Sequence, residues 1–410
     1  MKSLFELSRD LWVEAQLRAP DWAQRSVIPY LHGAKELMRL RPYLTIYRLS
    51  GHNQGGPLTV DYVGLDYLSG LLDNPFTDYR PTLVRNLFAE APTIKEIGRV
   101  ALWQAGTLTN LPGNDLVIVL GSQYLIRSLP RQNAIVQPFF VRMLLNVRGD
   151  WDDVKRRFHK NVRDYQLRLV RKYGYEYEVS PREEDFEMFY HQMYSPTMAQ
   201  RHHELASPMS VEEARQNFQR GFLHLIKRDG QYVAGGLSYP QGRIIRFRLI
   251  GVVNADEQLM REGALGAYYY AITHWANQEG YDYVSFGDSA PHLADGILQH
   301  KRRWGAAATC SDTSQQRIWL KVKRDTPAVR QFFKDNPLII IGERGQLQGL
   351  IVTDEPDKVT EATRQDWEKQ YATSGLEKLL ICSVADFFDG NPGIKKTKIS
   401  KLTFEGVSHE

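Results

Sequence analysis

The chain has 410 residues, of which 42% are hydrophobic and 11% aromatic, so it is long and apolar enough for two or three packed domains. Its formal net charge of +4 is too small to indicate nucleic-acid binding, and its two cysteines, Cys310 and Cys382, form neither a disulfide framework nor a zinc spacing. Because it has few cysteines, no signal-peptide core and no apolar run long enough to span a bilayer, we expect a cytoplasmic protein.

The first 148 residues are expected to form a mixed α/β domain. Hydrophobic periodicity predicts helices over 4–12 and 27–40 and strands over 43–49, 115–120 and 135–147. The last run is almost wholly apolar, which is typical of one buried central strand. The glycine-rich stretch 51–57 is expected to be a loop. It lacks the Lys-Ser/Thr ending of a phosphate loop, so we expect no nucleotide site there.

Residues 151–172 have apolar side chains at helical spacing, and Lys and Arg fill the other faces of the predicted helix. Two interpretations stay open. The first is a solvated surface with an apolar seam, and the second is a helix that binds phosphates. On the second interpretation, Arg157, Lys160 and Arg163 are the candidate phosphate-binding residues.

A further helix is expected over 185–198, and the segment after it is rich in titratable groups. Arg201 and His202 are candidates for binding an acceptor, although polar residues in a loop are commonly just solvated. The histidines there have no partners at metal-binding spacing, so we expect no metal site.

Three strands, over 222–227, 231–239 and 243–252, are predicted to form an antiparallel meander, because Asp229-Gly230 is a strong hairpin turn. A helix over 264–276, a strand over 281–286 and a helix over 294–303 follow. Gly287-Asp288-Ser289 is expected to end that strand. The carboxyl end of a strand is where α/β folds bind ligands, so Asp288 is a candidate site residue. Ordinary turn chemistry is the alternative.

This order of elements resembles the GNAT superfamily of N-acyltransferases, and most closely the branch of Fem-type aminoacyltransferases and acetyltransferases linked to cellulose biosynthesis. Four segments carry the resemblance: 151–163, 227–236, 270–288 and 296–305. The last, Gly296-Ile-Leu-Gln-His-Lys-Arg-Arg-Trp-Gly305, is similar to the family signature Gly-Leu-x-x-Phe-Lys-x-x-aromatic-Gly, with His300 in place of Phe.

The resemblance implies an α/β (α+β) fold with tandem GNAT-like domains, in which mixed, mostly antiparallel sheets are flanked by helices. It divides the chain into an N-terminal domain over 1–148, an acyltransferase domain over 149–310 and a C-terminal α/β segment over 311–410. That last segment either completes the first domain or forms a separate module. Its expected elements are strands over 317–323, 338–341, 347–353 and 378–384 and a helix over 359–373, before a basic tail at 395–401.

The resemblance also implies the site residues. It places the signature Lys301 beside the reacting carbonyl as a cation. Asp288 ends the strand expected to face the cleft, so it is the candidate to accept the amine's proton or to orient the acceptor. Tyr270 and Trp304 are expected to line the acceptor pocket. The family's pyrophosphate loop has its nearest match at Arg261 to Gly266, with alanine in place of one glycine.

The expected function is therefore transfer of an acyl group from acyl-CoA, as co-substrate, to an amine or a hydroxyl acceptor in cell-envelope or polysaccharide metabolism. An aminoacyl-tRNA-dependent transferase is one alternative, and only with that donor is a nucleic acid a partner of the transferase. A non-catalytic binding module of the same fold is the second. The third is a nucleic-acid-associated protein, which the basic helix over 155–172 suggests. We expect no permanently bound cofactor and no metal.

Overall fold

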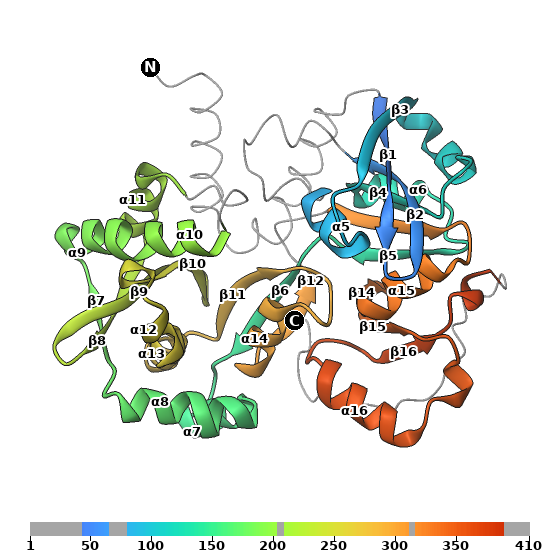
Figure 1. Cartoon of the computed structure of the whole chain (residues 1–410). Helices are drawn as coiled ribbons and strands as arrows, with labels where there is room; N and C mark the ends of the chain where they lie inside the picture. The colour runs from blue at the N-terminus through green and yellow to red at the C-terminus, as the bar shows by residue number, and fades with distance from the viewer. Residues whose placement is uncertain (1–42, 65–79, 203–208, 311–315, 389–410) are drawn as a thin grey trace, which may run out of the picture.

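The computed structural model describes residues 43–64, 80–202, 209–310 and 316–388. These residues form a mixed α/β fold with two large, mostly antiparallel sheets and a small third sheet, all flanked by helices, which confirms the predicted fold class. Figure 1 shows the two large sheets in two lobes, with β6, β11 and β12 of the second sheet, and α14, on the side that faces the first lobe. The expected helices over 4–12 and 27–40 and the basic tail lie outside the described residues.

The first sheet has the order β3-β1-β2-β4-β13-β5. Its strands are β1 Tyr43–Asn53, β2 Gly56–Gly64, β3 Thr93–Ala101, β4 Leu116–Ser122, β5 Ala134–Pro138 and β13 Gln316–Val322. The expected loop at 51–57 is wrong, because β1 and β2 continue into it as a tight hairpin. β2 pairs with β4 in parallel, and β13 lies between β4 and β5. Helices α5 Arg80–Leu87, α6 Gln123–Ser128 and α15 Pro327–Asp335 flank it.

The second sheet has the order β12-β6-β11-β10-β9-β8-β7. Its strands are β6 Val141–Asn146, β7 Glu176–Ser180, β8 Phe222–Arg228, β9 Gln231–Gln241, β10 Ile244–Val252, β11 Tyr283–Ser289 and β12 Ala307–Cys310. The predicted meander is confirmed. The sheet repeats the arrangement of the first one: an antiparallel hairpin, one parallel neighbour, and a strand from elsewhere in the chain inserted beside it.

The chain crosses from the first sheet to the second at 139–140. The prediction of one strand over 135–147 was wrong, because β5 belongs to the first sheet and β6 to the second. Pro138 ends β5, and it has no N–H with which to continue a ladder. Phe139 then packs in the core of the first lobe, whereas Val141 packs in the core of the second.

The expected helix over 151–172 is broken once, into α7 Trp151–Arg157 and a second helical stretch over 160–172. That stretch contains the π-helical η3 Val162–Gln166 and α8 Leu167–Lys172. The break comes at Phe158, whose extended backbone (ψ 141°) ends α7. The next predicted helix continues through α9 Glu183–Met188, η4 Phe189–Tyr194 and α10 Ser195–His202, and α11 Val211–Gln219 follows. The hydroxyl of Ser210 accepts from the Glu213 N–H and caps α11.

Helix α13, Ala264–Gln278, covers one face of the second sheet with Tyr268, Ala271 and Ile272, which are fully buried. The segment from α9 to α10 covers the other face. The short α12 Glu257–Arg261 precedes α13, and α14 Gly296–Arg303 follows β11. No helix in the described ranges has both the length and the apolar character needed to cross a membrane.

The third sheet has the order β14-β15-β16, with β14 Leu338–Ile341, β15 Leu347–Val352 and β16 Leu379–Cys382, and α16 Glu361–Tyr371 packs beside it. These elements confirm the predicted strands and helix of the C-terminal segment. The domain division at 148 and 310 stays a prediction. β13, which follows 310, pairs within the first sheet, whereas β6, which precedes 148, pairs within the second.

Candidate functional site

Strands β10 and β11 are parallel neighbours that separate halfway along their length. They pair only from Ile244–Arg246 to Tyr283–Ser285, although β10 runs to Val252 and β11 to Ser289. Beyond this point β10 shifts register against β9, and β11 shifts register against β6 between Ser285 and Asp288. The predicted end of the strand at Gly287 is instead a bulge, in which Gly287 has a φ of +77°. The sheet therefore opens at the carboxyl end of β11.

Asp288 lies on this bulge and is held by Arg142 of β6. The Arg142 Nε and Nη2 atoms donate to the two carboxylate oxygens over 3.0 and 3.3 Å. The Arg142 side chain is 5% exposed and that of Asp288 28%. A buried guanidinium is costly unless it is paired, and this fork geometry fixes the plane of the carboxylate.

Lys301 reaches the same bulge from α14. Its side chain is buried, and its Nζ donates to the main-chain carbonyl of Asp288 over 2.7 Å. Burial lowers the pKa of Lys301 to about 8. The carboxylates of Asp288 and Asp295 oppose this shift, and Arg142 adds to it. Asp295 also caps α14 by accepting from the Leu298 N–H, which fixes where the helix begins.

The structure thus brings together the two predicted catalytic residues, Lys301 and Asp288, and adds Arg142. Their catalytic role stays a prediction. Arg142 contacts the carboxylate of Asp288 and Lys301 its main-chain carbonyl, so two largely buried cations meet at one residue. Such an arrangement suits a group that bears or develops negative charge. An ammonium has three N–H donors, so Lys301 retains donors beyond the one used on Asp288. The sequence contained one indication that Arg142 has a special role, because it is a charged residue within an otherwise apolar predicted strand.

Aromatic rings fill the α13 side of the opening. Phe247 of β10 and Phe286 of β11 lie 5.0 Å apart, and Tyr269 of α13 lies 4.9 Å from Phe286. Trp304, a predicted acceptor-binding residue, is fully buried and stacks on Tyr269 at 5.4 Å. Its ring is therefore part of the wall behind the opening.

The other predicted acceptor residues lie elsewhere. Tyr270 stacks on His274 at 5.6 Å and meets the edge of Trp151, so it belongs to the contact between α13 and α7. Arg201 and His202 end α10, and their side chains lie outside the described part of the chain.

The predicted donor-binding residues do not form one cluster. Arg157 donates to the carbonyls of Asn146 and Arg148 over 3.1 and 2.9 Å, which ties α7 to the end of β6. Arg261 is exposed and forms an ion pair with Glu257 one turn away. Lys160, just before η3, and Arg163, within it, are exposed.

The first turn of α13 is packed, whereas the pyrophosphate of acyl-CoA requires an open one. A Cβ placed on Gly266 would lie 2.5 Å from the Oε1 of Gln166, and one placed on Gly263 would lie 3.1 Å from the Cβ of Leu169. η3 and α8 therefore pack against the first turn of α13, whose N–H groups bind phosphate in such sites. The residues present there do not fit the pyrophosphate cradle that the resemblance implies.

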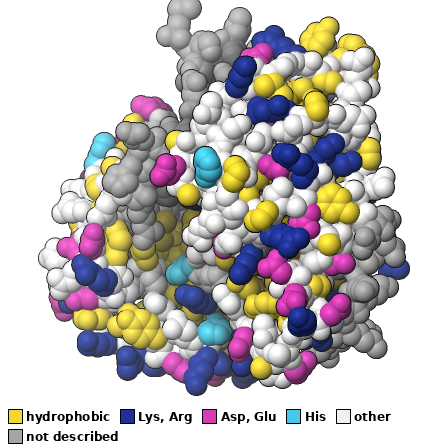
Figure 2. Space-filling model, turned by 45° about the vertical axis from the view of Figure 1, so that its right-hand side comes forward, with side chains coloured by type: hydrophobic (Ala, Val, Ile, Leu, Met, Phe, Trp, Pro, Cys, Tyr) yellow, Lys and Arg dark blue, Asp and Glu magenta, His cyan; other side chains and the backbone are white. Residues whose placement is uncertain are grey.

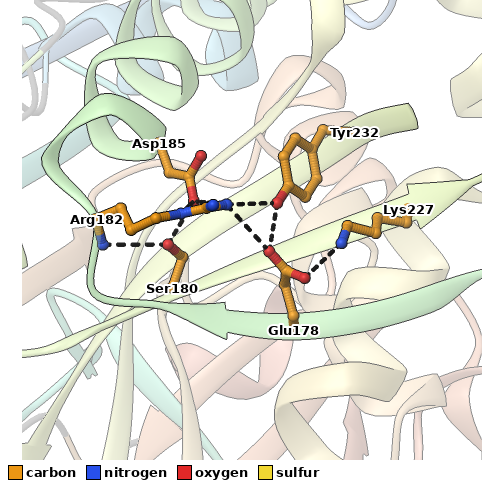
Figure 3. Close-up of polar contacts among 6 residues, drawn as sticks. All are labelled: Glu178, Ser180, Arg182, Asp185, Lys227 and Tyr232. Carbon is orange, nitrogen blue, oxygen red and sulfur yellow. Dashed lines mark hydrogen bonds and ion pairs between the residues drawn. The ribbon is translucent and has the colours of Figure 1, made fainter. Parts of the chain in front are cut away.

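A second polar cluster lies at the far edge of the sheet (Figure 3). Glu178 of β7 accepts from Lys227 and Tyr232, and Asp185 of α9 accepts from Ser180 and Arg182. Each carboxylate has a cation beside it, so the charges balance within the cluster. This arrangement joins an edge strand to its neighbours and leaves no excess charge for a ligand. Among the described residues, no three His, Cys, Asp or Glu side chains gather closely enough for a metal ion.

Comparisons with known proteins give structural likenesses only. No protein-family model and no curated protein matches the chain. The structure of FemX is similar with a TM-score of 0.37 and 12% identity, over 79% of this chain and 97% of that one. L-PGS from Bacillus licheniformis is similar with a TM-score of 0.33 and 10% identity, over 70% and 87%.

The ribosomal-protein-S18-alanine N-acetyltransferase from Escherichia coli is similar with a TM-score of 0.22 and 18% identity, over 27% of this chain and 64% of that one. At these scores the likenesses carry no conclusion about this chain. The functional case therefore rests on the strand arrangement and on the residues at the opening.

Proposed function

We propose that the chain is an acyltransferase of the GNAT superfamily, closest to its Fem-type branch, and that it moves an acyl group to an amine or hydroxyl acceptor. The observation that carries the proposal is the buried Lys301 ammonium on the bulge of β11, where β10 and β11 separate. The strand order of the second sheet and the signature around Lys301 support it.

In the proposed reaction the acyl carbonyl lies in the opening between β10 and β11. The acceptor amine attacks the carbonyl carbon, a C–N bond forms and the carbonyl oxygen becomes an oxyanion. Lys301 stabilises that charge through an N–H that the Asp288 carbonyl does not use. The bond to the carrier then breaks, and the carrier leaves with the proton that the amine lost. Asp288, fixed by Arg142, orients the acceptor's N–H or O–H group.

One observation favours an aminoacyl-tRNA over acyl-CoA as the donor. Gln166 and Leu169 cover the first turn of α13, where the pyrophosphate of acyl-CoA would bind. An aminoacyl-tRNA does not need that cradle. The acyl group itself still has to reach Lys301 in either case.

A donor screen tests the proposal. The purified chain is incubated with a panel of acyl-CoAs and charged tRNAs and a panel of amine- and hydroxyl-bearing acceptors, and products are detected by mass spectrometry. We expect an acylated acceptor from one donor class. A complete absence of transfer from both classes contradicts the proposed activity and favours the non-catalytic binding module.

A further inference from the structure

His159, Lys160, Arg163 and Arg303 form one exposed group, which we call the basic surface. The His159 N–H donates to the Arg303 carbonyl over 2.8 Å, and this bond joins the end of α14 to the turn after α7. A Cβ on Gly305 would lie 2.6 Å from the Arg157 carbonyl, so the two segments are in close contact. Residues at least 140 positions apart in the sequence therefore present their cations together.

The charges of this surface are not neutralised by neighbouring carboxylates. Within the described ranges, Lys160, Arg163 and Arg303 form no ion pair, whereas Lys155 and Arg156 pair with Asp152 and Asp153. Burial, and then the charges of Arg302, Arg303 and Arg163, lower the pKa of His159. On the face shown in Figure 2, acidic side chains lie among the basic ones over much of the described surface.

The position of the basic surface relates it to the reaction centre. α14 carries both Lys301 and Arg303. Residues two apart on a helix point about 200° away from each other, so one faces the opening and the other faces solvent. If the acyl group of the donor lies in the opening and the phosphates of its carrier lie in solvent, the carrier has to run along α14. The usual place for such phosphates, the first turn of α13, is covered.

We propose that the phosphate groups of the donor's carrier bind on the basic surface, and not at the first turn of α13. The assignment of this ligand as the donor rests on the proposed function, but phosphate binding by the surface does not. A nucleotide such as coenzyme A and the 3′ end of an RNA both offer phosphate esters at spacings that Lys and Arg can contact. Lys160, Arg163 and Arg303 supply the charge. His159 supplies a ring that becomes easier to protonate once an anion is bound.

The test measures binding without catalysis. Two fluorescent probes are used, labelled coenzyme A and an RNA hairpin with a single-stranded 3′ end, each titrated with the full chain between 50 and 300 mM salt. The variant carries Lys160→Gln, Arg163→Gln and Arg303→Gln. The control carries Arg131→Gln, Lys334→Gln and Arg344→Gln, which are exposed cations in the other lobe. Each triple substitution lowers the formal charge by the same amount, so only the position of the lost charges differs.

We expect at least one probe to bind the natural chain and the control with similar affinity, and the basic-surface variant at least tenfold more weakly. For the RNA probe, the slope of log K against log salt is negative. Loss of three phosphate contacts should make it shallower by about 2 to 3, at roughly 0.7 to 0.9 per contact. Weakening of the coenzyme A probe alone identifies a nucleotide carrier, and weakening of the RNA probe alone identifies an RNA carrier.

Three outcomes overturn the inference: no binding of either probe, equal weakening by the control substitutions, or binding that the basic-surface variant retains. Because no acyl transfer is measured, a failure here is distinct from a failure of the proposed activity. Transfer that persists at the natural rate in the variant, with phosphate binding lost, separates the ligand of this surface from the donor.

Discussion

At the scale of single residues, the proposed chemistry depends on why Lys301 is buried. A lysine side chain is rarely buried unless it is paired or hydrogen-bonded, because its charged form is unfavourable in apolar surroundings. Here the ammonium has one carbonyl at 2.7 Å and lies near a carboxylate already engaged by Arg142. The lowered pKa of Lys301 is the measurable sign of that cost.

This cost predicts a pH-dependent effect of Lys301→Met on stability. The pKa of Lys301 is about 8 in the folded chain against 10.5 for an ordinary lysine, so the unfolded chain binds more protons between these values. Stability of the natural chain therefore rises with pH across this window. Relative to Lys301→Met, we expect the free energy of unfolding of the natural chain to rise by about 3 kcal/mol between pH 7 and 10.5, at 1.36 kcal/mol per pKa unit.

The measurement is urea unfolding of both proteins at several pH values, followed by circular dichroism. Lys334→Met, at an exposed position of α15, is the control and should show no such trend. If the free energies of unfolding of Lys301→Met and the natural chain differ by the same amount at every pH, burial does not lower the pKa of Lys301.

At the scale of elements, the sequence predicted most helices and strands, because their hydrophobic periodicity is strong. The meander from β8 to β10 and the order of α13, β11 and α14 are confirmed. The failure at 135–147 has a clear physical cause. An apolar run indicates burial but not which core receives it, so these residues appeared as one strand although they serve two sheets.

The site was predictable only in part. The signature containing Lys301 and the strand end at Asp288 are local patterns, so they could be read from the sequence. The packing of Gln166 and Leu169 against the first turn of α13 could not, because it joins elements about 100 residues apart. The meeting of His159 with Arg303 is a tertiary contact of the same kind.

The edge strand β7 gives a prediction at this scale. Glu178 links it to Lys227 and Tyr232 (Figure 3). Hydrogen bonds from these partners lower the pKa of Glu178, and the bond from Lys227 has the larger effect. The link is thus present above the ordinary glutamate range and is lost as pH falls through the lowered value. We expect Glu178→Gln to speed hydrogen exchange in β7 at neutral pH, with a small global effect, since partly exposed ion pairs contribute about 0 to 1 kcal/mol.

Exchange is followed by mass spectrometry of peptides covering 176–180. Asp366→Asn, which removes the exposed pair with Lys369, is the matched control and should leave β7 unchanged. If the β7 peptides of Glu178→Gln exchange at neutral pH as slowly as those of the natural chain, the cluster does not stabilise the strand.

At the scale of the whole molecule, each large sheet takes a strand from a distant part of the chain. β13 lies between β4 and β5, and Trp319 and Ile318 on it are fully buried in the first lobe. A chain ending at residue 310 lacks this strand and would leave β4 and β5 without their shared neighbour. We expect the amides of β4 to lose their protection in that chain, while the second sheet keeps all seven strands.

Hydrogen exchange on the shortened chain checks this expectation. The relevant peptides cover 116–122 in the first sheet and 244–252 in the second. Full protection of 116–122 would mean that the first lobe folds without β13, and that the segment after 310 is a separate module.

The most direct test of the central claim is the rate of acyl transfer by Lys301→Met, with the donor and acceptor that the screen identifies. We predict a loss of about 10² to 10³-fold in the transfer rate, as expected when one donor to an oxyanion is removed. The exposed Lys334→Met control should transfer at the natural rate. Natural transfer by a folded Lys301→Met protein would contradict the claim that the acyl group changes carriers beside Lys301.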